Sequence, residues 1–580
     1  MKSLIIAFAL FIIPSALLSQ WSSDSSVNLK ISDQSGEQSL PKITLTSDGG
    51  CFIAWFDSRS GSYAVYLQRL NAQGVRQFAA DGLLISSNPQ SSSLVDWDMI
   101  ADDSNNAVIV FTDTRNGSSI NPFAYRVSSQ GNFLWGTNGI TLSNDFGVFQ
   151  ANPKAVQTSD NNFVITWIYT STPRKVAMQK ISPGGAKLWG NDPVYLSGSG
   201  SELFDYPSLV PSDNGSVIAL WCGYTGNFLN PVNYRLYSQK FNPAGNPVWN
   251  STQDTVYSLG RVSGFFVPKI FPDGLNGALY VWQDDRSFTN RSSTFAQRFN
   301  SAGVRSFPLN GSEASTTADN NKFDAWAAYM PSTNETYLIW KMSNGLQSQF
   351  GVYGQKFSSD GTLQWGNDGK VFQPLGSNSM EKLLCLTKDT SVIYSFNESI
   401  TGGINNIIKG FTTDRNGNIG WGGYIHTVSN PSSEKLKLVG IVNSNKMTML
   451  AWSDRRLDGG GIYAQNINSN GTLGNLTGIN NISSENPESI TLNQNYPNPF
   501  NPTTVINYQL SMFSNVSLKV YDVLGNEIKT LVNEYKPAGN YSVTFDAGDT
   551  GQGNNLSSGI YFYTLNAGLQ KQTKSMLLIK

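Results

Sequence analysis

The sequence contains a unit that recurs eight times with a period of about 57 residues. An aromatic residue ends an apolar run in each copy; these residues are Trp55, Phe111, Trp167, Trp221, Trp282, Trp340, Phe396 and Trp452. A glycine turn follows each run, at Gly74, Gly131, Gly185, Gly245, Gly303, Gly361, Gly417 and Gly471. Because two independent markers share one period, the repeat indicates a structural unit that the fold uses eight times.

Each unit predicts four short strands joined by turns that contain Gly, Asn or Asp. Apolar and polar residues alternate with a period of two, as in Tyr63-Ala64-Val65-Tyr66, and helical periodicity is absent from the repeats. A four-stranded antiparallel unit cannot bury both of its faces alone, whereas units stacked around an axis bury them against one another. The sequence therefore predicts an all-β chain whose residues 20–484 form an eight-bladed β-propeller with about 57 residues per four-stranded blade. A seven-bladed ring with one extra unit is the alternative.

Two segments compete to complete the last blade. Residues 21–32 resemble a fourth strand because Val27, Leu29 and Ile31 alternate with polar residues, and residues 475–483 resemble one as well. A second aromatic follows the glycine turn of seven copies, at Phe78, Trp135, Trp189, Trp249, Phe307, Trp365 and Trp421, whereas Asn475 breaks the series in the eighth. A closed ring leaves no strand edge exposed. The sequence leaves open which terminus closes it.

Charge and histidine content exclude several classes of function. Charged residues make up 14% of the chain and the formal net charge is −1, so no basic surplus exists to neutralise a nucleic-acid backbone. His426 is the single histidine, which excludes multi-histidine metal sites and leaves few routes to a histidine-assisted nucleophile. We expect no cofactor and no metal site.

The N-terminus carries a targeting signal. Met1-Lys2-Ser3 is a short basic start, and residues 4–18 are an apolar run broken at Pro14 and Ser15. Residues 1–19 therefore predict a secretory signal peptide that is cleaved after Ser19. The run is shorter than the ~20 residues that a membrane-spanning helix needs. We expect a mature chain without a transmembrane helix, located outside the cell or on its surface.

The last part of the chain, residues 485–580, predicts a small immunoglobulin-like β-sandwich made of short strands. Four motifs in this part occur in a characteristic order: Tyr496-Pro497-Asn498-Pro499-Phe500, Val520-Tyr521-Asp522-Val523-Leu524-Gly525, Ala538-Gly539-Asn540-Tyr541 and Ser558-Gly559-Ile560-Tyr561. With these motifs the segment resembles the type A C-terminal sorting domain of the type IX (Por) secretion system, which is similar to the FlgD-type sandwich. The resemblance implies export by the Sec route and recognition by the type IX machinery. It also implies release from the cell or attachment to surface lipopolysaccharide.

One polar motif recurs in the propeller. An aromatic residue, any residue, Asp, any residue and Arg follow one another at Trp55–Arg59, Phe111–Arg115, Trp282–Arg286 and Trp452–Arg456. Copies eight, one and two are neighbours in a closed ring, which would gather three pairs on one arc: Asp57 with Arg59, Asp113 with Arg115, and Asp454 with Arg456. Arginine binds carboxylates and hydroxyls in a forked geometry, so this arc is a candidate site for a glycan or an acidic ligand. The alternative is that each Asp holds its own Arg.

No motif of the propeller predicts catalysis. The few glutamates recur in no pattern, and no pair of carboxylates suited to glycoside chemistry stands out. We therefore expect a non-catalytic ligand-binding or adhesion module whose partner is a polysaccharide, lipopolysaccharide or a surface protein. A carbohydrate-active enzyme, either glycosidase or lyase, is the alternative, and a structural surface component is a third.

Overall fold

The computed structural model describes residues 20–580 except 91–94, 117–118, 228–229, 250–253, 264–265, 288–290, 318, 401–404, 458, 476–489, 511–513, 537–538, 549–555 and 568–569. The chain divides into two compact units, Met1–Asn475 and Leu476–Lys580. The predicted signal peptide and the predicted domain boundary after residue 484 lie outside the described residues and stay predictions. In the part of the chain that is described, no helix has the length and apolar character that crossing a membrane requires.

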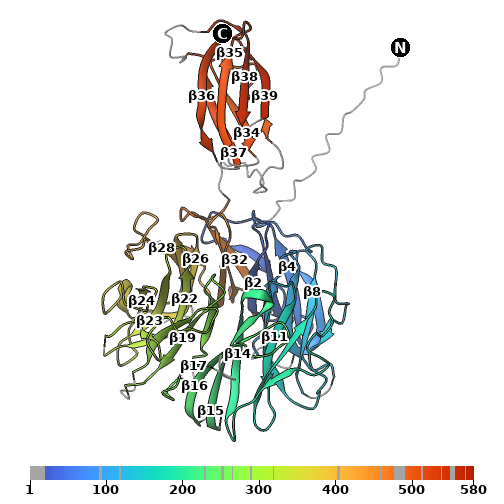
Figure 1. Ribbon diagram of the computed structural model, residues 1–580, viewed down its shortest axis with the longest axis vertical. Coiled ribbons are helices and arrows are strands. Elements are labelled where there is room, and N and C mark those ends of the chain that lie inside the picture. Colours follow the sequence, from blue (N-terminus) through green and yellow to red (C-terminus); the bar gives the residue numbers. More distant parts are fainter. Residues whose placement is uncertain are drawn as a thin grey trace. The chain divides into compact units, whose positions relative to one another are not determined.

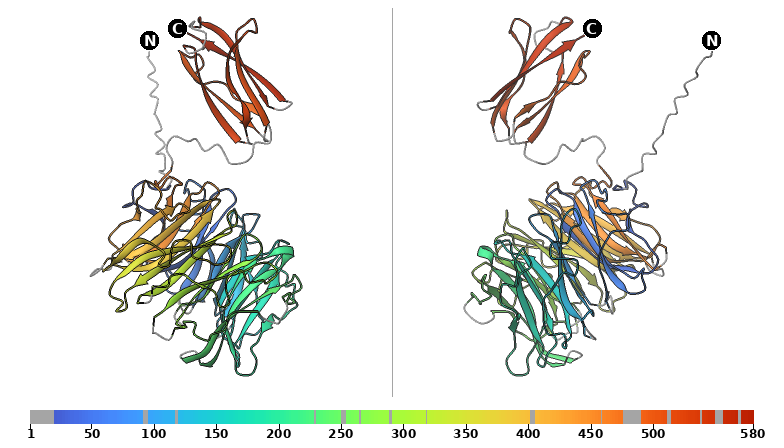
Figure 2. Two further views of the ribbon diagram at one scale, coloured as in Figure 1. Left: turned by 60° about the vertical axis from the view of Figure 1, so that its left-hand side comes forward. Right: turned by 90° about the vertical axis from the view of Figure 1, so that its right-hand side faces the viewer.

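The first unit is a β-propeller of eight four-stranded antiparallel sheets, as the repeat predicts. The sheets stand around a common axis, with the first and last blades side by side (Figures 1 and 2). In every blade the strand that comes first in the repeat is the innermost strand, and the chain then runs outward. The second strands are buried along their whole length in four blades because a neighbouring blade covers each face.

The strands of blades 1 to 4, from the axis outward, are Gln38–Leu45 (β2), Cys51–Asp57 (β3), Tyr63–Leu70 (β4) and Leu83–Gln90 (β5); Asp98–Ala101 (β6), Ala107–Asp113 (β7), Asn121–Val127 (β8) and Ile140–Thr141 (β9); Gln150–Gln157 (β10), Phe163–Tyr169 (β11), Lys175–Ile181 (β12) and Val194–Leu196 (β13); and Leu203–Pro211 (β14), Val217–Asn227 (β15), Asn230–Phe241 (β16) and Asp254–Tyr257 (β17). A single 3-10 turn, Asp213–Gly215 (η1), joins β14 to β15.

The strands of blades 5 to 8, in the same order, are Lys269–Pro272 (β18), Ala278–Asp284 (β19), Ser293–Phe299 (β20) and Ser312–Glu313 (β21); Asn321–Met330 (β22), Glu335–Ser343 (β23), Phe350–Phe357 (β24) and Lys370–Gly376 (β25); Ser379–Lys388 (β26), Ser391–Ser399 (β27), Asn406–Thr413 (β28) and His426–Ser429 (β29); and Lys435–Val442 (β30), Thr448–Asp454 (β31), Gly461–Ile467 (β32) and Leu29–Ser32 (β1).

The N-terminal segment closes the ring. Strand β1 pairs antiparallel with β32, with Leu29 opposite Ala464, and so forms the outer strand of blade 8. Leu29 and Ile31 are buried in a cluster that spans blades 8 and 1. Residues 29–32 therefore supply the outer strand of the last blade, which the sequence leaves open. Residues 476–483 of the competing segment lie outside the described residues.

Aromatic side chains connect each blade to the next. The ring of Trp135 packs on Gly185 of the following blade, and its Nε1 donates a hydrogen bond of 3.0 Å to the Pro183 carbonyl. A Cβ added at Gly185 would lie 2.9 Å from that ring, and its φ of +89° also favours glycine. This contact explains why glycine and the second aromatic recur together in the repeat.

Trp21 supplies the aromatic that the eighth copy lacks. Its side chain is buried, a Cβ at Gly74 would lie 2.8 Å from its ring, and its Nε1 donates a hydrogen bond of 2.9 Å to the Ala72 carbonyl. The series breaks at Asn475 because the outer strand of blade 8, and the aromatic that precedes it, come from the other end of the chain.

The second unit is a β-sandwich. One sheet holds Thr491–Leu492 (β33), Thr503–Leu510 (β34) and Gly539–Asp546 (β37), and the other holds Glu527–Lys536 (β36), Ser514–Tyr521 (β35), Gly559–Ala567 (β38) and Gln570–Leu578 (β39). Phe500 is buried in its core, and backbone hydrogen bonds join Phe500 to Leu577 and Ile579 near the end of the chain.

The predicted sorting motifs occupy defined places in this sandwich. Tyr496 is exposed, Gly525 lies in the turn before β36 with a φ of +83°, Gly559 begins β38, and Tyr561 is buried. Tyr541 stacks on Tyr508 with ring centroids 5.3 Å apart. The remaining motif residues, Pro497, Asn498 and Pro499, precede β34, and Gly539 begins β37.

Candidate functional site

The Asp–Arg motif forms ion pairs inside single blades. Asp57, Asp113 and Asp454 are fully buried, and each pairs with the arginine two residues later. The Arg59 Nε donates to Asp57 at 2.9 Å, and the Trp55 Nε1 donates to the other carboxylate oxygen at 3.0 Å. Burial of the carboxylate is therefore compensated by donors from its own strand and from the turn that follows it.

Each arginine also lies over an aromatic ring of the third strand. The guanidinium carbon lies 4.1 Å from the Tyr66 ring centroid for Arg59 and 3.8 Å from the Phe123 centroid for Arg115. Both arginines then donate to a carbonyl in the loop before the outer strand, that of Asp81 or Asn138. The pair thus connects the end of the second strand to the loop that leads into the fourth.

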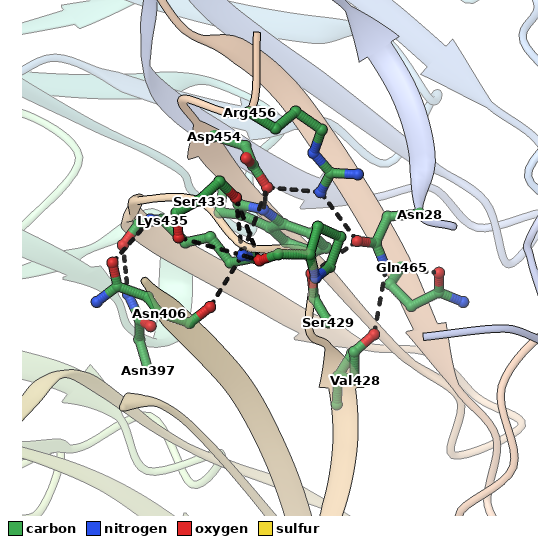
Figure 3. A network of polar contacts seen from close by, with 12 residues as sticks. Asn28, Asn397, Asn406, Val428, Ser429, Ser433, Lys435, Asp454, Arg456 and Gln465 are labelled. Carbon is green, nitrogen blue, oxygen red and sulfur yellow. Dashed lines mark hydrogen bonds and ion pairs between the residues drawn. The ribbon is translucent and has the colours of Figure 1, made fainter. Parts of the chain in front are cut away.

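Arg456 makes the corresponding contacts across the ring closure. Its guanidinium lies 3.8 Å from the Tyr463 ring centroid and donates to Asp454 at 2.6 Å and to the Asn28 Oδ1 at 3.0 Å. Asn28 directly precedes β1, so the loop that Arg456 holds is the N-terminal segment (Figure 3). Asn28 also accepts a hydrogen bond of 2.6 Å from Ser429 in blade 7.

A buried lysine completes this network. The Lys435 Nζ donates to the carbonyl oxygens of Pro431 and Asn406 at 2.6 and 2.9 Å, and it lies 4.0 Å from the Asp454 Oδ2 (Figure 3). Burial lowers the pKa of Lys435 to about 8, with Asp454 opposing this shift. Each of these side chains has at least one partner within the fold, whereas the Asp454 Oδ1 and the Arg456 Nε have no hydrogen-bond partner within the described residues.

The main cavity of the propeller lies on its axis. It has a volume of about 580 Å³, and its lining includes inner-strand residues of all eight blades. A second cavity of about 550 Å³ shares Lys42, Asp96 and Lys382 with it, so the two are compartments of one channel. A volume of this size falls in the range of small-molecule and oligosaccharide sites. The lining residues of both compartments, taken from the described part of the chain, include none of the six predicted Asp and Arg residues.

Bulges in the inner strands place side chains in this channel. The pairing register shifts at the same place in six blades, as in β2 between Ser39 and Lys42 and in β10 between Ala151 and Lys154. Asn152 and Asp324 adopt positive φ at these bulges. A bulge redirects the side chains around it, which is why such irregularities often occur at functional sites.

Two groups of charged residues face the channel half a turn apart in the ring. In blades 1 to 3, Lys42 and Lys154 both form ion pairs with Asp96, the first at 2.8 Å. Burial alone would raise the pKa of Asp96, but the two ammonium groups outweigh it and hold that pKa well below its usual range. In blades 5 to 7, Lys269 pairs with Asp324 at 2.8 Å, and Lys382 approaches the same carboxylate.

Lys382 differs from the other channel lysines. No hydrogen bond or ion pair to its ammonium occurs within the described residues; its Nζ instead lies 4.7 Å from the Trp326 ring centroid. Burial lowers its pKa to about 8, opposed by Asp324 and reinforced by Lys269 and Lys42. The Trp326 ring lines the cavity, with Phe271 at 5.3 Å between centroids.

Sequence reasoning missed these channel residues. Three of the lysines carried a signal in the sequence, because Pro-Lys recurs in or next to the inner strand, in Pro41-Lys42, Pro153-Lys154 and Pro268-Lys269. Proline has no N–H to donate to a sheet and often marks a bulge. The recurrence therefore pointed to an irregular strand with a lysine at its irregularity.

Comparison with known proteins identifies the second unit. Residues 494–580 match the family described as secretion system C-terminal sorting domain. This part of the chain is thus a sorting domain of the type IX secretion system, as the motifs predict. No curated protein matches the sequence.

Solved propellers are similar to the first unit. The Dos1 propeller has 10% identity and a TM-score of 0.40, covering 76% of this chain and 95% of that one. The polysaccharide lyase Uly1 has 10% identity and a TM-score of 0.39, covering 78% and 94%. A Penicillium chrysogenum alpha-L-arabinanase complexed with arabinobiose has 12% identity and a TM-score of 0.32, covering 55% and 92%. Similarity at this level concerns the fold and carries no conclusion about ligands or activity.

Proposed function

We propose that the protein is a secreted ligand-binding propeller that takes a polysaccharide in its central channel. The sorting domain at residues 494–580 implies export by the type IX machinery, to the cell surface or beyond it. The observation that supports a ligand in the channel is the concentration of lysines, carboxylates and aromatic rings that the inner-strand bulges direct to the axis. Convergent polar groups in an otherwise apolar cavity are typical of binding sites.

The Asp–Arg arc remains a second candidate surface for the same ligand class. Its geometry supports a structural role more directly, because Asp57 and Asp113 accept hydrogen bonds from their own blades at both carboxylate oxygens. The buried Oδ1 of Asp454 has no hydrogen-bond partner within the described residues. A ligand would have to compete with the aromatic ring and the loop carbonyl for each guanidinium.

Binding to an array of polysaccharides tests the proposal. The full exported chain is compared with Trp326→Ala, which removes an aromatic wall of the channel, and with Tyr424→Ala, a control at an exposed ring. We expect Trp326→Ala to lose binding and the control to keep it. Binding that persists unchanged in Trp326→Ala, with both variants folded, would move the site out of the channel.

A carbohydrate-active enzyme is the alternative, and one observation favours it. Three channel carboxylates, Asp96, Asp98 and Asp324, share the cavity and its surroundings with Lys382, whose pKa of about 8 suits proton transfer near neutral pH. Turnover distinguishes the two functions. An enzyme releases new reducing ends or unsaturated sugars from a bound polysaccharide, whereas a binding module returns it intact.

A further inference from the structure

We infer that the channel selects sugars that carry a carboxylate, which Lys382 binds while the sugar ring stacks on Trp326. This inference rests on the proposed function, since it names the ligand class of the same channel. The site that carries it is defined by two side chains from neighbouring blades, Lys382 on β26 and Trp326 on β22.

Among the described residues that line the main cavity, one cation has no carboxylate partner. Lys42, Lys154 and Lys269 all have carboxylate partners at Asp96 or Asp324. Asp98 accepts backbone N–H groups of Met99 and Ala155, at 3.0 and 3.1 Å. Within the described lining of the main cavity, Lys382 is thus the cation that no carboxylate pairs with directly.

The surroundings of Lys382 favour an anion over water alone. A partly buried ammonium loses hydration, and the neighbouring Lys269 and Lys42 add positive potential, which Asp324 and Asp96 oppose. An incoming carboxylate would restore a charge-assisted hydrogen bond, which is stronger than a neutral one. The same carboxylate placed near Asp96 would meet two ammonium groups that already pair with Asp96, and Lys154 also interacts with Asp98.

Trp326 adds the requirement for a ring. Its indole lines the cavity next to Lys382, with Phe271 behind it and Lys269 Nζ 5.6 Å from its centroid. A flat aromatic wall beside a cation suits a molecule with one apolar face and one acidic substituent. Among extracellular polysaccharides, that description fits uronic acid units, in which a carboxylate replaces the neutral hydroxymethyl group of the ring.

Oligogalacturonate and its methyl ester provide a matched pair of probes, because the ester removes the charge of the carboxyl group and adds only a methyl group. We expect the full chain to bind the acid about 10- to 100-fold more tightly than the ester, the range of a hydrogen bond to a charged group. Lys382→Met should abolish this preference. Lys30→Met, which removes an exposed lysine on the outer strand of blade 8, should retain it. Trp326→Ala should weaken the binding of acid and ester alike.

The outcomes separate this inference from the proposed function. Equal binding of acid and ester, or an unchanged preference in Lys382→Met, overturns the carboxylate selection and leaves a polysaccharide-binding channel standing. Failure of every glycan to bind overturns the proposed function itself. If Lys382→Met does not fold, amine acylation of the unmodified chain replaces it: the acid should protect Lys382 from the reagent, and equal protection by acid and ester refutes the selection.

Discussion

The closure of the propeller by the N-terminal segment predicts a large and specific effect of Trp21→Ala. Trp21 is only 3% exposed, its ring covers Gly74, and its Nε1 donates to the Ala72 carbonyl. Truncation of a buried tryptophan costs about 3–5 kcal/mol, and the lost hydrogen bond adds about 1 kcal/mol. We therefore expect Trp21→Ala to destabilise the closed ring by about 4–6 kcal/mol.

Trp135→Ala is the matched control because Trp135 makes the same contact between two blades that are continuous in the chain. Both variants should lower the denaturation midpoint, followed by circular dichroism because tryptophan fluorescence changes with the substitution itself. Hydrogen exchange should separate them: Trp21→Ala exposes β1 and its partner β32, whereas Trp135→Ala leaves that pair protected. If Trp135→Ala lowers the midpoint while Trp21→Ala changes neither the midpoint nor the exchange of β32, the N-terminal segment does not close the ring.

Three further predictions follow from the same contacts. Replacing Arg59, Arg115 and Arg456 together by Ala should destabilise the propeller, by about 3 kcal/mol or more for each buried carboxylate left unpaired, while polysaccharide binding in the channel persists. Thermal denaturation measures the stability and a binding assay measures the affinity. Lost binding at unchanged stability would instead assign the ligand site to the arc. Because the pKa of Lys382 is lowered from 10.5 to about 8, the unfolded chain holds a proton that the folded chain releases between these values. Stability relative to Lys382→Met should therefore rise as the pH increases from about 8 towards 10.5, and a difference that is flat or falls over this window in denaturant titrations contradicts the assignment. A chain that lacks residues 494–580 should keep its propeller, since the two units are separately compact, but it should accumulate in the periplasm, on the inner side of the outer membrane. Cell fractionation that finds this shortened chain in the medium would refute the role of the sorting domain.

Much of the fold could be predicted from the sequence because every blade is built from the same local pattern of residues. Turn glycines and strand-ending aromatics are local requirements, so they recur with the period and identify eight blades. The ring closure could not be predicted from the period alone, since the pairing of Leu29 with Ala464 joins the two ends of the propeller. One signal was present: Trp21 precedes an alternating segment just as Trp135 precedes β9.

The candidate site was less predictable because the two residues at its centre, Lys382 and Trp326, do not recur with the period. The recurrence of the Asp–Arg pairs suggested a ligand site, but in the structure these residues form ion pairs within single blades. Lys382 and Trp326 each occur once, on different inner strands, and a bulge on each strand sets where they point. Only the arrangement of the blades in a ring places the Lys382 Nζ 4.7 Å from the centroid of the Trp326 ring.

The pairing of β1 with β32 also has a consequence for protein synthesis. Strand β1 is among the first segments to leave the ribosome, but its partner begins at Gly461, and the sorting domain follows shortly after. A chain interrupted anywhere before that point lacks both the strand with which β1 pairs and the sorting domain. The order of segments therefore couples the two, so that truncated products, in which β1 would have no partner strand, also lack the sorting domain.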